Sequence, residues 1–153
     1  MVLDLGSSAF AEGERIPSKY TADGADVSPP LAWGEPPEGT GCFALISDDP
    51  DAPVGTWVHW VVYNIPASAR GLDEGVPADE KLADGTLQGT TDFGRVGYGG
   101  PAPPPGKDHR YFFKLYALDS KLDLAPGAGK KEALAAMEGH VLEKSETMGV
   151  YRR

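Results

Sequence analysis

The stretch Cys42–Ile65, CFALISDDPDAPVGTWVHWVVYNI, contains two apolar segments separated by an acidic turn that includes proline. The segments CFALIS (42–47) and HWVVYNI (59–65) are short and rich in β-branched and aromatic residues, which favours strands over helices. Asp and Pro favour tight turns, because Asp side chains bond to following amides and Pro presets φ. The stretch therefore predicts two antiparallel strands joined by a hairpin-like connection.

Two further apolar segments fit the same description. RYFFKLYAL (110–118) and VLDL (2–5) are short, are bounded by turn residues and are predicted as strands. Within the predicted strands, CFALI (42–46) and FFKLYAL (112–118) are almost continuously apolar, which is typical of strands covered on both faces. Two packed sheets would provide that cover, so we expect a mostly β protein built as an antiparallel β-sandwich.

One stretch has a clear helical pattern. KKEALAAMEG (130–139) consists of strong helix formers, with Leu134 and Met137 spaced i, i+3 and Gly139 in position to end the helix. The tail HVLEKSETMGVYRR (140–153) fits either a second helix or a last strand, and its Thr, Gly, Val and Tyr content favours the strand. The predicted fold class is therefore mostly β with one or two short helices.

The chain has the length of one domain, and residues 1–153 contain no repeat or linker that would divide it. Its formal net charge of −9 opposes binding to nucleic acid and stable association with anionic membranes. No signal-peptide pattern and no membrane-spanning apolar run occurs, so we expect a soluble cytoplasmic protein. The only cysteine, Cys42, lies in an apolar segment and is predicted to be a small core residue.

Three predicted loops, 17–41, 50–55 and 97–106, hold 11 of the 14 prolines and 9 of the 20 glycines. In the first loop, Trp33 stands between two proline pairs, which predicts that its ring pins the loop onto the core. The same prolines fit an exposed polyproline motif as the alternative.

Strand polarity gathers the candidate functional residues at one end of the sheet. Asp49 and Asp51 follow the first strand of the hairpin, and His59 opens the second, so the hairpin returns His59 beside the carboxylates. His109 and Tyr111 open a later strand, which reaches the same end if it runs antiparallel to the first. The loop rich in glycine and proline arrives there too.

The alternation of side chains along an extended chain sorts these residues by face. Three pairs are spaced i, i+2, so each can project to a common side: Asp49 with Asp51, Trp57 with His59, and His109 with Tyr111. If those sides coincide, a pocket with two carboxylates, two imidazoles, a phenol and an indole results. By the same alternation, Trp57 and Trp60 are expected on opposite faces.

Such a pocket can hold a small anion in spite of its carboxylates. A carboxylate beside an imidazole holds the ring protonated and orients its N–H groups, and a carboxyl group that keeps its proton can donate to a phosphate oxygen. We expect Gly100 to let the backbone approach the ligand closely and supply amide donors, with the prolines holding that approach in place.

The acidic cluster has two alternative interpretations. DPDAP (49–53) is also a good structural turn. Asp48, Asp49 and Asp51 with His59 could bind a divalent metal ion, although the spacing is not that of a calcium-binding loop. We expect neither a metal nor another cofactor. The common hydrolase, zinc and nucleotide-binding motifs do not occur in the sequence.

Three motifs in register resemble the phosphatidylethanolamine-binding protein family: DDPDAP (48–53), W-x-H-W (57–60), and YGGP followed by PPPG-x-x-HRY (98–111). The segments YTADGADVSPPLAW (20–33) and GHVLEKSETMGVY (139–151) are similar to its shorter bacterial and archaeal branch. The resemblance implies a central antiparallel β-sandwich with few helices. It also implies a small pocket at one end of the sheet for phosphate-like groups and phospholipid headgroups.

Carried over residue by residue, the resemblance assigns eight ligand-binding residues: Asp49, Asp51, Trp57, His59, Gly100, Pro101, His109 and Tyr111. It gives Arg110 a structural role on the opposite face, paired with a carboxylate. Eukaryotic members carry a C-terminal helix beside the pocket, whereas this sequence ends at Arg153, so regulation of a Raf-type kinase and membrane headgroup binding are not expected to carry over. The proline run PAPPPG (101–106) is longer than the eukaryotic loop, which indicates a different rim.

The leading hypothesis is a non-enzymatic binding protein with an anion pocket that modulates or inhibits a kinase or protease. The resemblance also allows a homodimer. The alternative is a hydrolase in which His59 or His109 acts as general base, oriented by Asp49 or Asp51. A third interpretation is an inhibitor that contacts its partners through surface loops such as 68–90.

Overall fold

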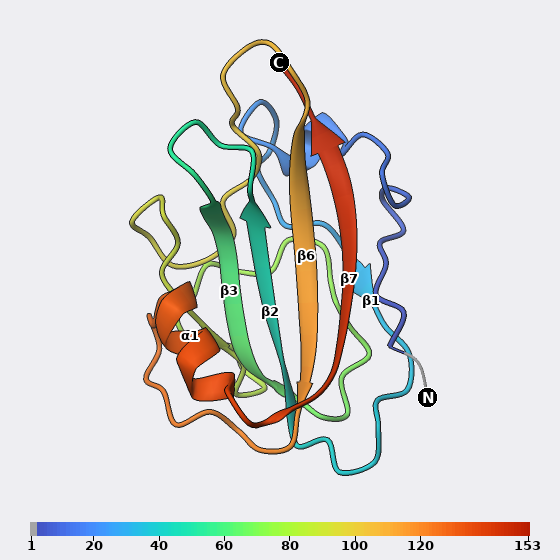
Figure 1. Ribbon diagram of the computed structural model, residues 1–153, viewed down its shortest axis with the longest axis vertical. Helices are drawn as coiled ribbons and strands as arrows, with labels where there is room; N and C mark the ends of the chain where they lie inside the picture. The colour runs from blue at the N-terminus through green and yellow to red at the C-terminus, as the bar shows by residue number, and fades with distance from the viewer. Residues whose placement is uncertain (1–2) are drawn as a thin grey trace.

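The computed structural model describes residues 3–153 (Figure 1). Its main element is a five-stranded antiparallel sheet with the strand order β5-β3-β2-β6-β7. The strands are β2 (Cys42–Asp49), β3 (Trp57–Pro66), β5 (Leu87–Gln88), β6 (His109–Leu118) and β7 (Val141–Tyr151). The predicted hairpin, the later strand and the strand in the tail are confirmed.

A second layer covers one face of this sheet. It contains a two-stranded antiparallel sheet, a single 3-10 turn and long loops: β1 (Leu31–Ala32), β4 (Gly71–Leu72) and η1 (Ser18–Tyr20). Trp33 packs on Phe43 of β2 with ring centroids 5.3 Å apart, and its indole N–H donates to Ala69 O. Trp33 thus pins its loop onto the core, as predicted, and the fold is a mostly β antiparallel sandwich.

The helix α1 (Lys130–Met137) packs on the opposite face of the sheet (Figure 1). Gly139, with a φ of 82°, follows it as the expected stop signal. The predicted apolar face is wrong in part, because Ala133 and Met137 are buried whereas Leu134 is 38% exposed. The helix packs through this i, i+4 pair, in which the small Ala133 allows a close approach to the sheet.

The strand predicted at 2–5 does not form in Leu3–Leu5, and its first residue lies outside the described residues. Asp4 has a positive φ of 45°, which interrupts extended backbone. The amides on either side donate to side chains of β7, Glu143 at 3.0 Å and Ser145 at 2.9 Å, instead of to a neighbouring strand.

The strand β2 is buried along its whole length, as predicted, and burial raises the pKa of the Cys42 thiol to about 11. The expectation of full cover is wrong for β6, whose outward side chains are half-buried or exposed. Two of them, Phe112 and Tyr116, are covered only in part by lysines, with Nζ atoms of Lys114 and Lys144 at 5.5 and 5.7 Å from the ring centroids.

Candidate functional site

A cavity of about 220 Å³ lies at the end of the sheet where β2 ends and β3 and β6 begin, the upper end in Figure 1. Four polar residues line it: Asp49, His59, His109 and Tyr111. The other eight lining residues are apolar: Ala52, Pro53, Val54, Trp57, Phe93, Ala102, Pro103 and Pro104. The cavity therefore combines a few polar groups with an apolar wall, as small-molecule sites generally do.

Asp49 and His109 form a buried pair on the floor of the cavity. The Nδ1–H of His109 donates to Asp49 Oδ2 at 2.8 Å, and each side chain is 4% exposed. The other carboxylate oxygen of Asp49 accepts the amide of Asp51 at 2.7 Å. Both oxygens of Asp49 thus have protein donors, and the bond at Nδ1 leaves Nε2 as the His109 ring nitrogen without a protein partner among residues 3–153.

His59, which lines the cavity, lies at a β-bulge in β3. Trp60 pairs with Ser47 and Val58 pairs with Asp48, so His59 is the extra residue between them. The bulge puts Trp57, His59 and Trp60 on the same face of the sheet, so the predicted separation of the two tryptophans is wrong.

The ring of His59 is held by main chain on the loop before β6. Its Nδ1–H donates to Gly99 O at 2.6 Å, and the Gly99 amide donates back to His59 O at 2.9 Å. Burial lowers the pKa of His59 below its ordinary value, although the bond to Gly99 and the charge of Asp49 oppose the shift. The expectation that a carboxylate holds this imidazole charged is therefore wrong, since its direct partner is a neutral carbonyl.

Aromatic rings complete the site. The rings of His59 and Tyr111 meet edge to face at 5.2 Å, and Phe93 packs edge-on against both His59 and Trp57, at 5.3 and 5.7 Å. Burial, followed by the charge of Asp49, raises the pKa of Tyr111 above its ordinary range. The phenol is a neutral donor at physiological pH.

Asp51 does not line the cavity. Its carboxylate takes the Arg110 guanidinium in two bonds of 2.9 Å and the Arg110 amide in a third. These bonds lower the pKa of Asp51 to about 2. The expected common side for Asp49 and Asp51 is wrong, because the chain turns directly after Asp49. Arg110, by contrast, is paired with a carboxylate, as the resemblance implied.

Gly100 and Pro101 also lie outside the cavity lining. The Gly100 amide donates to Asp26 Oδ1 at 2.8 Å, and Pro101 O accepts the Ala22 amide at 3.0 Å. A Cβ on Gly100 would lie 2.4 Å from Tyr20 O. The close backbone approach that we expected toward a ligand is made instead toward the segment 20–26.

Sequence reasoning missed most of the apolar wall. Phe93 lies in a loop with no apolar periodicity, so no pattern indicated it. Pro103 and Pro104 belong to the proline run that drew attention, but they stand further along it than the residues that we selected. Val54, which is 81% exposed, follows the acidic turn, and its only signal was an apolar residue in a loop.

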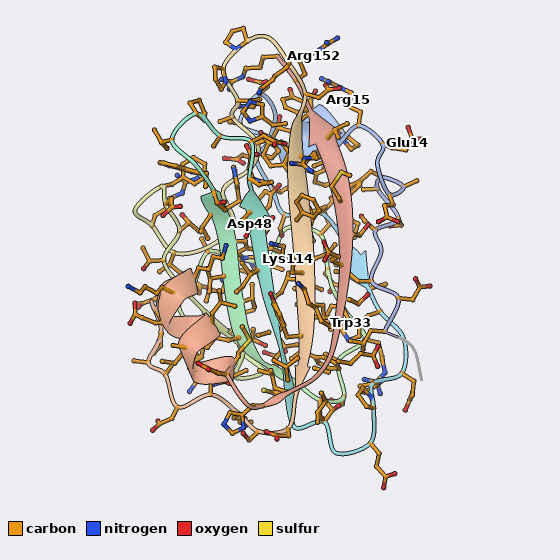
Figure 2. The ribbon with its side chains drawn as sticks, in the orientation of Figure 1. Glu14, Arg15, Trp33, Asp48, Lys114 and Arg152 are labelled. Atoms are coloured by element: carbon orange, nitrogen blue, oxygen red, sulfur yellow. The ribbon has the colours of Figure 1, made fainter. Side chains whose placement is uncertain are left out.

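The metal alternative loses two of its members, since Asp51 is bonded to Arg110 and neither Asp51 nor Asp48 lines the cavity. Asp48 points to the opposite face, where its carboxylate contacts Lys114 and Lys130 at 3.2 and 2.7 Å. Figure 2 shows Asp48 and Lys114 on the neighbouring strands β2 and β6. The described part of the chain holds no group of three or more His, Cys, Asp or Glu side chains that could bind a metal ion. Nor does it contain a helix with the length and apolarity needed to cross a membrane.

The site residues can act as hydrogen-bond donors and acceptors around a small ligand. Neither lysine nor arginine lines the cavity. A negative charge placed there would depend on imidazole and phenol donors instead of a cationic side chain.

Proteins similar to this chain occur in archaea and in bacteria. A UPF0098 protein from Methanothermobacter thermautotrophicus is 54% identical over 151 residues, 99% of each chain. The crystal structure of a putative phosphatidylethanolamine-binding protein homologue, CT736 from Chlamydia trachomatis, is 38% identical with a TM-score of 0.90 and covers 99% of this chain and 97% of its own. Escherichia coli YbcL, described as a new member of the mammalian PEBP family, is 33% identical with a TM-score of 0.91, over 99% of this chain and 98% of its own. The sequence model of the phosphatidylethanolamine-binding protein family matches residues 6–152, and the chain belongs to this family.

Proposed function

We propose that this protein is a non-enzymatic binding protein whose cavity takes a small oxyanion, either a phosphate-like group, such as that of a phospholipid headgroup, or a carboxylate. One observation carries the proposal: the buried Asp49–His109 pair and the ring of His59 face the same cavity. None of the twelve lining residues is a Ser, Thr, Cys or Lys that could serve as a nucleophile.

The bond to Asp49 orients His109 for this role. Because Nδ1–H is committed to the carboxylate, Nε2 is the ring nitrogen left for the ligand, and it donates to a ligand oxygen once the ring takes up a proton. The neutral Tyr111 hydroxyl lies on the same floor, where a hydrogen bond to Asp49 is one of the causes that raise its pKa. Since the cavity has no fixed cation, an anion would bind together with a proton. The apolar wall suits the carbon portion of a larger ligand.

Calorimetry with inorganic phosphate, acetate and phosphoethanolamine tests the proposal. We expect His109→Gln to weaken phosphate binding by about tenfold or more, the loss of one charge-assisted hydrogen bond. His140→Gln is the matched control, because His140 is exposed and bonds to Asp119 away from the cavity. Equal affinity in the wild type and His109→Gln would remove the pocket assignment.

A hydrolase is the second candidate, and the Asp49–His109 pair favours it as well. A carboxylate that orients an imidazole is the arrangement of a general base, which would take a proton from water as the water attacks an ester. Turnover of 4-nitrophenyl phosphate or 4-nitrophenyl acetate that is lost in Asp49→Asn would favour this candidate. A wild-type rate no higher than that of buffer alone would count against hydrolysis of that substrate, and His140→Gln should match the wild type in either case.

A regulatory role toward a kinase or protease is part of the same proposal. A partner would sense whether the cavity is filled, because Val54 and Pro53 expose apolar surface at its wall. Binding of free phosphoethanolamine without binding of phosphatidylethanolamine vesicles would favour the soluble group as ligand. The net charge of −9 predicts weak attraction to anionic vesicles.

A further inference from the structure

The cavity wall formed by Ala102, Pro103 and Pro104 belongs to no strand or helix. No sheet ladder fixes this wall, so its position depends on individual hydrogen bonds from neighbouring segments. Figure 1 shows the C-terminal end of the chain lying against the loop that precedes β6. A segment distant in sequence therefore supports the wall.

Arg153 makes that contact. Its guanidinium Nη1 donates to Pro103 O at 3.3 Å, in the middle of the wall. Its own carbonyl accepts the Gly106 amide at 3.4 Å. One residue thus holds the loop at two points, on either side of Pro104 and the proline that follows it.

Asp23 fixes the guanidinium in turn. Its carboxylate accepts bonds from Arg153 Nε at 3.0 Å and Tyr151 Oη at 2.7 Å, and Arg153 Nη2 lies 2.9 Å away. Tyr151 is 3% exposed and lies in β7, so this carboxylate is tied to the main sheet. The planar guanidinium held at Nε and Nη2 has little freedom left, which aims Nη1 at the wall.

We infer that Arg153, held by Asp23, is a positioning residue that sets the placement of the Pro103–Pro104 wall and thereby the size of ligand that the cavity accepts. The inference rests on the proposed function. The polar floor, Asp49 with His109, lies on β2 and β6 and is held independently of Arg153. The affinity for a ligand that contacts only the floor should not depend on where the wall lies, whereas a larger ligand also contacts the wall.

The ion pair itself contributes little to global stability. The side chains of Arg153 and Asp23 are 34% and 36% exposed, and water and salt screen the attraction in pairs this exposed. Removing the arginine should therefore loosen the wall without unfolding the protein, which makes the positioning effect measurable by itself.

Two probes of different size test the inference in Arg153→Ala. We expect the Kd for phenyl phosphate to rise about fivefold or more, while the Kd for inorganic phosphate changes less than about twofold. Arg152→Ala is the matched control, because it removes the same charge from the neighbouring residue, whose nearest carboxylate, that of Asp108, is 3.9 Å away. Asp23→Asn should reproduce the effect of Arg153→Ala, and the double variant should add nothing further.

The outcomes separate this inference from the proposed function. Equal effects on both probes, or no effect on either, overturn the positioning role while leaving the anion pocket in place. If the wild type binds neither probe, the proposed function fails for phosphate-like ligands, and amide hydrogen exchange decides the positioning role. Faster exchange over residues 100–108 in Arg153→Ala, and not in Arg152→Ala, supports it. Unchanged exchange overturns it.

Discussion

Nδ1 of His109 lies 2.8 Å from Oδ2 of Asp49, and both side chains are almost fully buried. Buried pairs of this kind are weak contributors to stability, because desolvation offsets most of their attraction. The pair also lies on the floor of a cavity instead of inside the packed core. Its position favours a role in ligand binding over a role in folding.

The pH dependence of binding provides the first prediction. Burial lowers the pKa of His59 below its ordinary value of about 6.5, so the ring is neutral at pH 7. An anion in the cavity favours the protonated ring, so binding takes up a proton. The affinity for sulfate, whose own charge is constant, should rise as the pH falls from about 8 to about 5.5, by at most about tenfold per unit for one proton. Calorimetry at several pH values measures it, and His59→Gln should flatten the curve.

Asp51→Asn should lower stability mainly above pH 4. The Arg110 bonds hold the folded-state pKa of Asp51 at about 2, below the ordinary 3.8, so its stabilisation is present above about pH 4 and is lost toward pH 2. We expect a cost of about 1 kcal/mol at pH 7, because the arginine is half-exposed. Urea unfolding at pH 7 and pH 2.5 measures the difference, with the exposed Asp108→Asn as control. A cost that does not shrink in acid would contradict the assignment.

Gly100→Ala should destabilise the protein although the residue lies in a loop. The new Cβ would lie 2.4 Å from Tyr20 O and 2.5 Å from Asp26 Oδ1, so one backbone segment has to move. We expect a loss of about 2–3 kcal/mol in the free energy of unfolding. Gly6→Ala is the control, since no atom lies within 4 Å of its Cβ position. Equal melting temperatures for Gly100→Ala and Gly6→Ala would show that the backbone around residue 100 moves to accommodate the Cβ at little cost.

Replacing both lysine partners of the buried Asp48 should destabilise the protein more than replacing Asp48 itself. Asp48 is 1% exposed, whereas Lys114 and Lys130 are about a quarter exposed. Replacing both lysines with Met leaves a buried carboxylate uncompensated, at an expected cost of about 3–5 kcal/mol. Asp48→Leu leaves two lysines that can turn to water, so it should cost less. Urea unfolding measures the loss of stability in each variant. A larger loss in Asp48→Leu than in the double lysine variant would contradict this prediction.

The sequence predicted the convergence of Asp49, His59, His109 and Tyr111 because strands carry strong local signals and antiparallel strands share their ends. It failed for Asp51, because the i, i+2 rule holds only in extended chain. The Asp51 amide bonds to the Asp49 side chain, so the chain has already turned.

The β-bulge at His59 and the contribution of Phe93 had no local signal. The bulge depends on the register in which β2 and β3 pair, and neither segment taken alone predicts that register. Phe93 reaches the cavity from a loop whose path follows from tertiary contacts. Periodicity predicted the strands, and only the packed structure revealed what fills the space between their ends.

The bonds between His59 and Gly99 make the chemistry of one imidazole depend on a residue that has no side chain. The acceptor is a main-chain oxygen, so no substitution at position 99 removes it. A Cβ there would, however, lie 2.5 Å from Cδ2 of Phe93. Any larger residue would displace either the ring that packs on His59 or the carbonyl that decides which of its nitrogens carries the proton. Homologues that keep this imidazole in the same tautomer are therefore expected to tolerate variation along the proline run more readily than at this one glycine.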